Sequence, residues 1–381
     1  MRDANRAPRW PLAALLAVLF PTAANAHVKW FCAYDVAGQP RGLEQVLCAQ
    51  FEWLTAIALI CLTLGTLIER TEAGRLSTIG LNWLTQWPRA NTERLVRGVC
   101  GAFFVALWTM GGVILTPELK TTAEWIPWFQ LAMAACFLWR QTLPLAGLGI
   151  YVLFGIGIHD YGVFHLADYP VFLGVGTFLI LTGFGWSFFG IRPLDFLRFT
   201  AAVTLMWASV EKWAYPQWTD PLLAQKPEMT MGFSGDLFMD AAGVIEFTLA
   251  FGLIWTSMVR RYSAAVLVFI FVSAIFGFGK IDAIGHSGII VVLVALVADD
   301  HVMKVENLPL AWLRRILRPL ERTRNLGFAT PALYLVALAL FLGAYYGSHN
   351  MLYPESYGAI VAPKDIPKGV LAPVSGYAEA K

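Results

Sequence analysis

The stretch LTAIALICLTLGTLI, residues 54–68, has no charged side chain and could form most of a membrane-spanning helix. Similar apolar stretches recur along the chain, and about 20 residues of apolar helix span a bilayer. The sequence therefore predicts an all-α polytopic membrane protein with about ten transmembrane helices in the mature chain. The predicted spans are residues 50–69, 95–115, 119–139, 143–158, 170–190, 194–213, 235–258, 262–279, 286–298 and 329–347.

The composition supports this prediction. Hydrophobic residues make up 57% of the 381 residues and charged residues 14%, whereas a soluble domain carries about 25% charged residues. The 28 Lys and Arg against 26 Asp and Glu leave a net charge of +2, which creates no field for gathering nucleic acid. Composition thus excludes soluble, disordered and nucleic-acid-binding classes, and the expected partner is the lipid bilayer.

Residues 1–26 have the three parts of a secretory signal peptide. Three arginines precede an apolar run at residues 12–20, and Ala24-Asn25-Ala26 has the A-x-A pattern of a cleavage site. The alternative is an uncleaved first helix, which Pro21 and the short apolar run disfavour. Cleavage would leave His27 as the mature N-terminus, outside the cytoplasm.

The arginines predict the orientation, because cytoplasmic loops are enriched in Lys and Arg. Alternate loops are rich in arginine, and the loops between them hold mostly His, Asp, Glu and aromatic residues. With His27 outside, every arginine-rich loop is cytoplasmic, which predicts a bacterial inner-membrane protein with both mature termini in the periplasm. The residues are Arg70, Arg75, Arg89, Arg94 and Arg97, then Arg140, then Arg192 and Arg198, then Arg260 and Arg261, and finally Lys304, Arg314, Arg315, Arg318, Arg322 and Arg324.

The remaining segments are assigned by composition. Residues 27–94 comprise an external segment, the first span and a cytoplasmic loop. Residues 299–328 mix apolar and basic side chains, which predicts an amphipathic helix on the inner leaflet. The last span is 329–347, and the external tail 348–381 contains four prolines and is expected to be extended.

Five cysteines occur. Three lie inside predicted spans, where they are most simply small packing residues. Cys32 and Cys48 both fall in the first external segment, where a disulfide would persist. A bridge between them is one prediction, and burial of Cys48 at the start of the next helix is the alternative. The chain has no C-x-x-C, which disfavours a thiol–disulfide relay.

The chain contains an internal similarity that predicts a duplication. Residues 154–160 (FGIGIHD) align with 276–282 (FGFGKID) at an offset of 122 (276 − 154), and the same offset pairs Glu124 with Glu246. The predicted units are two parallel four-helix repeats, 95–193 and 194–298. Because both enter from the cytoplasmic side, they would be related by an axis along the membrane normal.

Charged groups in the second unit indicate a polar pocket, because such groups inside spans usually face a bundle interior or a cavity. Glu246 lies about ten residues into its span, roughly 15 Å from the outer end. Its carboxyl is expected to stay protonated or to pair with a cation. The side chains predicted to converge with it on an outward-facing pocket are Glu211, Lys212, Lys280, Asp282 and His286. The alternative is a set of helix ends with ordinary solvated charges.

The first unit carries His159, Asp160, His165 and Asp168 within ten residues. Imidazole and carboxylate together suit a divalent metal, and His beside Asp also suits proton handling. A water-facing loop with several polar residues is the alternative, since no H-x-x-x-H or H-E-x-x-H pattern occurs. A mature N-terminal His27 would offer an amine and an imidazole as a further metal chelate.

Residues 194–298 resemble the DoxX-like family of four-helix bacterial membrane proteins. The resemblance rests on FLR at 196–198, VEKW at 210–213, AGVIE at 242–246, FGL at 251–253 and the Arg260-Arg261 turn, and it covers about a quarter of the chain. The first unit would be a diverged copy without counterparts to Glu211 and Lys212. The family includes a subunit of a thiosulfate:quinone oxidoreductase and partners of oxidative-stress or thiol systems. The resemblance therefore implies a quinone-linked or redox-accessory role.

The leading hypothesis is an inner-membrane protein whose periplasm-facing cavity handles protons, a quinone headgroup or a small solute. Glu246 would be the buried acid, His286 the proton carrier and Asp282 the residue that orients it. Lys280 would contact an anion or headgroup, and a redox or periplasmic protein is the expected partner. The alternatives are a transporter for a metal ion or small solute, which would use the same acids as ligands, and a non-catalytic assembly subunit.

Overall fold

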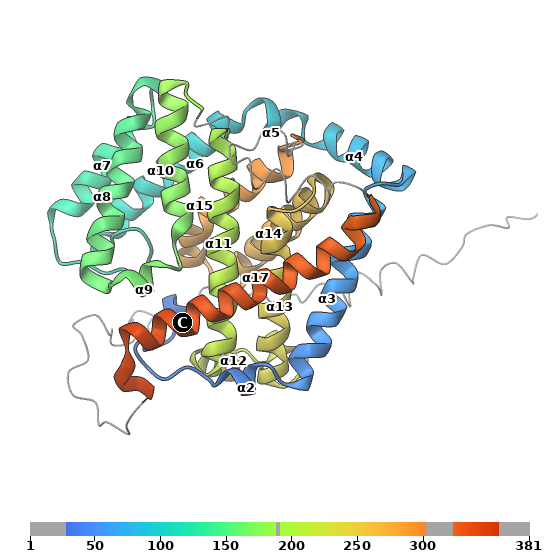
Figure 1. Ribbon diagram of the computed structural model, residues 1–381. Helices are drawn as coiled ribbons and strands as arrows, with labels where there is room; N and C mark the ends of the chain where they lie inside the picture. Colours follow the sequence, from blue (N-terminus) through green and yellow to red (C-terminus); the bar gives the residue numbers. More distant parts are fainter. Residues whose placement is uncertain (1–27, 188–190, 302–322, 358–381) are drawn as a thin grey trace, which may run out of the picture.

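The computed structural model describes residues 28–187, 191–301 and 323–357, and these residues are almost entirely helical (Figure 1). The predicted signal peptide, His27, most of the basic segment 299–328 and most of the tail 348–381 lie outside the described residues. Within the described part, extended pairing is limited to one isolated bridge between Val113 and Lys120.

Each predicted span coincides with, or overlaps, one helix of the described residues. These helices are α3 (Ala49–Ile68), α6 (Thr92–Met110), α7 (Trp125–Cys136), α8 (Leu143–Tyr161), α10 (Pro170–Phe184), α11 (Pro193–Ala214), α13 (Gly235–Leu253), α14 (Ser257–Phe278), α15 (Lys280–Ala298) and α17 (Thr323–Leu352). The other helical segments are η1 (Val28–Trp30), α2 (Leu43–Val46), α4 (Glu72–Leu84), α5 (Gln86–Ala90), η2 (Arg140–Thr142), α9 (Val163–Leu166), η3 (Pro216–Trp218), α12 (Asp220–Gln225), η4 (Pro227–Thr230) and η7 (Pro354–Tyr357). The segment between α3 and α6, expected as a cytoplasmic loop, is therefore largely helical.

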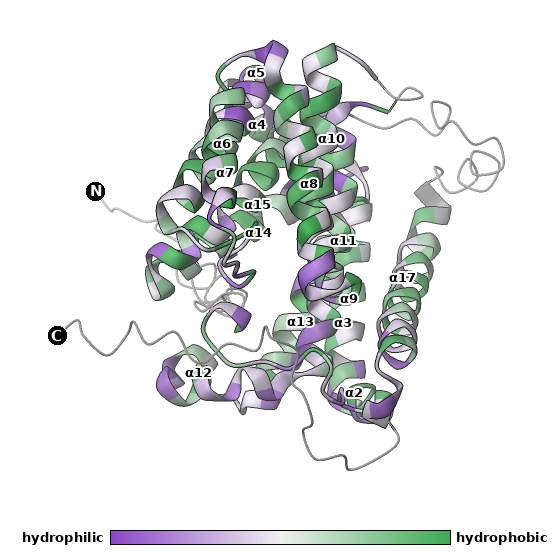
Figure 2. Cartoon of the chain, turned by 90° about the vertical axis from the view of Figure 1, so that its left-hand side faces the viewer, coloured by the Kyte–Doolittle hydropathy of each residue, from purple (hydrophilic) through white to green (hydrophobic). Residues whose placement is uncertain are grey.

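Five of these helices are long and apolar enough to cross a membrane, counted over the described residues. They are Ala49–Ile68, Arg140–Tyr161, Ser257–Phe278, Lys280–Ala298 and Leu326–Leu352. Most residues along the helices are hydrophobic, and hydrophilic residues are concentrated toward the helix ends (Figure 2). The chain is thus an all-α, membrane-embedded protein. Helices α6, α11 and α13 carry more charged residues, so the total of ten spans stays a prediction.

Eight of the described helices form a closed ring. Helix α6 packs on α7, α7 on α8, α8 on α10, α10 on α11, α11 on α13, α13 on α14, α14 on α15, and α15 packs back on α6. The two predicted four-helix units are the two halves of this ring. Helices α3 and α17 pack on each other outside it, with α3 against α13 and α17 crossing α11 diagonally (Figure 1). The origin of the halves by duplication stays a prediction.

Arginines at one end of the ring cap the neighbouring helices. The helices alternate in direction, so four of them begin where the other four end. Carbonyls at helix ends lack intrahelical donors, and the helix dipole favours cations there. Arg97 donates to the carbonyl of Leu138 at 2.7 Å, Arg140 to that of Thr182 at 3.1 Å, and Arg261 to that of Val297 at 2.7 Å. The arginines that predicted the cytoplasmic side therefore also hold this end together.

A buried loop joins α6 to α7. Gly111 and Gly112 have positive φ, and the loop then turns inward, so that Ile114, Leu115 and Leu119 have no exposed surface. Backbone inside an apolar layer needs hydrogen-bond partners, and Gln130 of α7 supplies them by donating to the carbonyls of Val113 and Ile114. This loop carries Thr116 and Glu118 into the protein interior.

The predicted disulfide between Cys32 and Cys48 is absent, because both cysteines are free thiols. Cys32 packs against the cluster of Leu222, Leu223 and Met229, whereas Cys48 caps α3 and packs on the main core. The alternative expected for Cys48, burial at the start of the next helix, is met only in part, because Cys48 is half-buried there. The chain between the two cysteines runs across one end of the ring.

Close packing of α8 on α10 should make Gly147→Ala destabilising. A Cβ at Gly147 would lie 2.5 Å from the carbonyl oxygen of Gly176, and overpacking of this kind costs about 1–3 kcal/mol. The matched control is Gly155→Ala on the same helix, where a Cβ meets nothing within 4 Å and Ala should leave stability unchanged or improve it. Thermal unfolding of the purified protein measures both, and equal behaviour of the two variants would contradict this packing.

Candidate functional site

A cavity of about 90 Å³, counted as space open to the centre of a water-sized molecule, lies inside the ring. One water needs about 10–15 Å³ on this measure, so the cavity holds several. Its walls come from both halves of the ring and from η1. Much of the wall is apolar and is formed by Phe103, Phe104, Phe172, Val175, Leu205 and Ile289.

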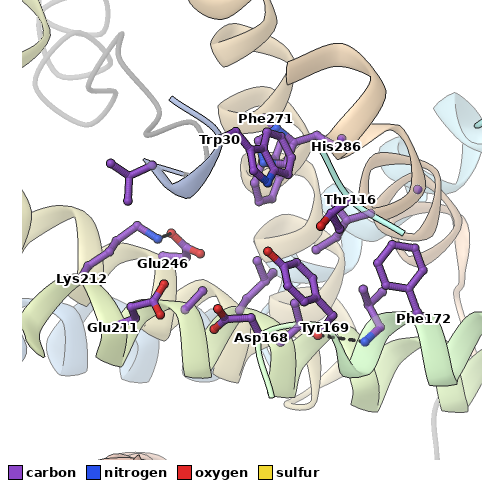
Figure 3. Close-up of a pocket in the computed structure, with 18 of the residues that line it drawn as sticks. Trp30, Thr116, Asp168, Tyr169, Phe172, Glu211, Lys212, Glu246, Phe271 and His286 are labelled. Carbon is purple, nitrogen blue, oxygen red and sulfur yellow. Dashed lines mark hydrogen bonds and ion pairs between the residues drawn. The ribbon is translucent and has the colours of Figure 1, made fainter. Parts of the chain in front are cut away.

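Lys212 and Glu246 form an ion pair at the cavity wall. The Lys212 Nζ lies 2.8 Å from Glu246 Oε2, and each side chain is 17% exposed (Figure 3). Glu246 is in the middle of α13 and Lys212 is in the last turn of α11, so the pair joins two neighbouring helices of the ring. Of the two states expected for Glu246, the structure has the one paired with a cation.

His286 lies on the opposite wall. Its Nδ1 is 3.1 Å from Asp282 Oδ2, one turn earlier on α15. The imidazole lies between two aromatic rings, with centroid distances of 4.6 Å to Trp30 and 4.7 Å to Phe271. Figure 3 shows these three rings on one side of the cavity and the charged side chains on the other. Asp282 is fully buried behind His286, and the contact between them is an approach of charges without hydrogen-bond geometry.

Lys29 is a fully buried cation beside the cavity. It belongs to η1, its side chain has no exposed surface, and its Nζ contacts Asp168 Oδ2 and, at 2.6 Å, Glu211 Oε1. Burial by itself lowers the pKa of Lys29, but the charges of Asp168, Glu211 and Glu118 outweigh it and hold that pKa well above the usual 10.5. The ammonium therefore stays charged inside the protein.

A second buried network lies beside Lys29. Glu118, from the buried loop, accepts a hydrogen bond from Tyr169 and lies with its Oε1 2.9 Å from His165 Nε2. The ring of Tyr34 meets the His165 ring edge-on at 5.5 Å. Three carboxylates, one lysine and one histidine thus share this interior. Even with His165 protonated, the carboxylates outnumber the cations, so the cluster needs an additional proton to be neutral.

Residues 28–41, which we name the cover segment, extend across this end of the ring. Tyr215 donates to the carbonyl of Gly38 at 2.7 Å, and Tyr346 of α17 donates to that of Arg41 at 2.6 Å. Trp30 packs directly on Gly285, where a Cβ would lie 2.1 Å from the indole ring. The cover segment therefore lies over this end of the ring, with Trp30 in the cavity wall and Lys29 among the buried carboxylates beside it.

The structure brings together only some of the predicted site residues. Glu211, Lys212, Glu246 and His286 line the cavity, with Asp282 behind His286. The role expected for Lys280 as a headgroup contact is wrong, because this residue is exposed in the first turn of α15 and is not part of the wall.

The expected equivalence of the two halves is wrong for their acids. Asp160 pairs with His159 at the surface, with side chains 38% and 87% exposed, whereas Asp282 is buried. Glu124 is an exposed residue at the start of α7, unlike Glu246. The reason is the register: α8 ends at Gly162 and α14 at Gly279, both with positive φ. Counted from these glycines, the buried His165 corresponds in position to Asp282, three residues after the glycine in each half.

His159 and His165 consequently do not share a site, because one is at the surface and the other lies in the buried network with Glu118. Among the residues that the structure describes, no group of three or more His, Cys, Asp or Glu side chains is placed to hold a metal ion. The metal chelate proposed for His27 lies outside the described residues.

Sequence reasoning missed Lys29, Glu118 and Tyr169. Lys29 is close to the predicted cleavage site, and a single lysine before an aromatic residue gives no sign of burial. Glu118 looks like a polar residue at the end of a span. A usable signal was the apolar sequence around it, VILTPEL at 113–119, since a short acidic interruption in such a run indicates a buried carboxylate.

Comparison with known protein families, curated proteins and solved structures finds no match for this chain. The DoxX-like resemblance of residues 194–298 therefore stays a prediction.

Removing the buried ammonium should strongly destabilise the protein. Lys29→Met leaves Asp168 and Glu211 without their cation, and breaking a buried pair in this way costs about 3–5 kcal/mol. The triple variant with Asp168→Asn and Glu211→Gln should recover much of the loss. Lys226→Met is the control, because Lys226 is only part-buried and contacts a backbone carbonyl. Denaturant unfolding gives the comparison, and a stable single variant would refute the importance of the pair.

The pH dependence of this contribution has a definite sign. A lysine with a raised pKa stabilises the folded state fully below its unfolded pKa, and the contribution is lost as the pH rises through the folded pKa. The difference in stability between wild type and Lys29→Met should therefore not shrink across neutral pH, and it should decline only as the pH rises from about 10.5 toward the higher folded pKa of Lys29. A difference that shrinks between pH 6 and pH 9 would contradict the assignment.

A side chain at Gly285 should displace the cover segment. Gly285→Ala places a Cβ 2.1 Å from Trp30, whereas Gly288→Ala on the same helix meets nothing within 4 Å. Cys32, two residues from Trp30, is half-buried and should react faster with a water-soluble maleimide in the Gly285 variant alone. Equal labelling rates in both variants and the wild type would show that Trp30 does not hold the cover segment.

Proposed function

We propose that this is a quinone-linked protein of the bacterial inner membrane, whose central cavity holds a quinone headgroup and exchanges protons with it. One observation carries the proposal: the Lys212–Glu246 pair and His286 face a cavity whose remaining wall is largely aromatic and aliphatic. Binding sites for small apolar molecules typically combine such a wall with a few placed polar groups.

The residues present fit this ligand. A quinone has a flat ring with apolar faces and carbonyl oxygens that accept hydrogen bonds. Lys212 and His286 carry donors on different walls of the cavity, and Phe103, Phe172 and Leu205 offer an apolar surface for the ring and its tail. In this assignment Lys212 takes the headgroup contact that the sequence suggested for Lys280.

A bound quinone supplies redox chemistry, because its reduction takes up equal numbers of electrons and protons. The protein's own residues would handle the protons. His286 is suited to hold and release one, since imidazole is the side chain that most readily exchanges a proton near neutral pH, and the Asp282 carboxylate lies 3.1 Å from its Nδ1. Glu246 can accept another when Lys212 turns from it toward a ligand. Electrons would come from a redox or periplasmic partner protein.

The proposed orientation places the cover segment in the periplasm. It is supported by the arginines that predict the cytoplasmic side, which cap the helices at the opposite end of the ring. A headgroup would then be held near the periplasmic face, beneath Lys29 and Trp30.

The proposal is tested by extracting the purified protein and measuring bound quinone and metal. Copurifying quinone that a short-chain quinone analogue displaces supports it. Stoichiometric metal without quinone would contradict it in favour of a metal transporter, and absence of both would favour an assembly subunit.

Substitutions in the cavity should weaken quinone binding. Glu246→Gln and His286→Ala each alter a charged or hydrogen-bonding group, which is worth about 1.5 kcal/mol or more, so the affinity for the analogue should fall about tenfold. Asp160→Asn and Glu124→Gln are the matched controls, because both residues are exposed away from the cavity. Fluorescence quenching by the analogue gives the affinities. Four variants with wild-type affinity would remove the cavity as the binding site.

A further inference from the structure

Helices α4 and α5 present large apolar residues on their outer face, whereas a helix of a soluble protein usually turns such residues toward the core. Along them, Gly74, Asn82 and Thr85 face the protein, whereas most of the large apolar residues face outward. Leu76, Ile79, Trp83 and Trp87, which we name the outer stripe, are 62%, 53%, 71% and 66% exposed. Leu76, Ile79 and Trp83 are spaced three or four residues apart on α4, so they share one face of that helix, and Trp87 follows on α5.

The inward face is fixed by polar contacts. Arg261 of α14 donates to the side chain of Asn82 at 2.6 Å and to that of Thr85 at 2.9 Å. Arg89 donates to the carbonyl of Asn82 at 3.0 Å, and Ser77 hydrogen-bonds to Tyr262. These contacts hold the helices in one rotation, so the outer stripe cannot turn inward to bury itself.

The angle between α3 and α4 is fixed as well. Thr71 caps α4 by accepting a hydrogen bond from the backbone of Gly74 at 3.3 Å. Gly74 packs against the end of α3, where a Cβ would lie 2.3 Å from the carbonyl oxygen of Ile68. The chain therefore turns sharply as it leaves α3, and α4 and α5 lie at the end of the ring opposite α2 and α12 (Figure 1).

An outward face of this kind is unfavourable in water, because exposing a large apolar side chain costs about 1.5–3 kcal/mol relative to burying it. Its surroundings indicate lipid as the partner. The outer stripe follows directly on the exposed apolar face of α3, where Trp53 and Ile60 are 72% and 59% exposed. Tryptophan is enriched where the acyl chains meet the headgroups, and basic residues there attract anionic lipids. Arg70 and Arg75 flank the turn.

We propose that α4 and α5 lie in the plane of the membrane–water interface, with the outer stripe among the acyl chains and the arginines beside it binding anionic headgroups. The helices would then set the depth at which the arginine-capped end of the ring sits in the bilayer. This proposal does not depend on quinone binding.

The first test is photo-crosslinking of the full chain in lipid nanodiscs. Trp83 is replaced by p-benzoyl-phenylalanine, an aromatic residue of similar size, and Glu228 of η4, an exposed residue at the opposite end, receives the same replacement as a control. Irradiation should attach lipid to the protein severalfold more often at position 83, as read by intact mass. No lipid adduct at position 83, or a crosslink to a second protein copy instead, would overturn the proposal.

The second test addresses the headgroups. The wild-type protein should unfold at a higher temperature in phosphatidylglycerol nanodiscs than in phosphatidylcholine nanodiscs, and Arg70→Gln with Arg75→Gln should remove most of that difference. Arg41→Gln, at the opposite end of the ring, should preserve it. Equal unfolding temperatures of the wild type in both lipids would overturn the headgroup assignment.

Discussion

The buried ammonium of Lys29 connects the parts of this protein that are farthest apart in sequence. Its partners are Asp168, at the entrance to α10, and Glu211, near the end of α11. Those two helices form the α10–α11 boundary between the halves of the ring, which we name the seam. A charge without water is tolerable only when it is paired, so the cover segment, the seam and the cavity wall must assemble together. A structure lacking any one of them would leave bare charges inside an apolar protein.

The two ends of the ring are held by different chemistry. At one end arginines donate to the carbonyls that finish alternate helices, and the same charges suit a headgroup layer. At the other end the cover segment is held through buried charges and aromatic rings, with Trp30 on Gly285 and Lys29 between carboxylates. The cavity lies beside this second end, and Val28 and Trp30 of the cover segment form part of its wall.

The cavity and the buried network differ in their balance of acidic and basic groups. The Lys212–Glu246 pair is neutral as a unit, whereas the network of Glu118, Asp168 and Glu211 has more acids than cations. Glu211 and Lys212 are adjacent in α11 and both line the cavity. A proton gained or lost in the network therefore changes the electrostatic potential at the cavity, because charges inside a protein are weakly screened.

The apolar runs of the sequence predict the helices and their approximate bounds, because a run of bilayer length favours a helix that satisfies its own backbone hydrogen bonds. The sequence also singled out Glu246, His286, Glu211 and Lys212, since charges within such runs must find an interior. Tertiary structure alone decided which of them meet. The register of the two halves depends on where Gly162 and Gly279 end their helices. Aligning the two FGxG motifs does not reveal these end points. Lys29 and Glu118 enter the site from a terminal segment and a loop, whose folding inward is set by long-range contacts and by no local pattern.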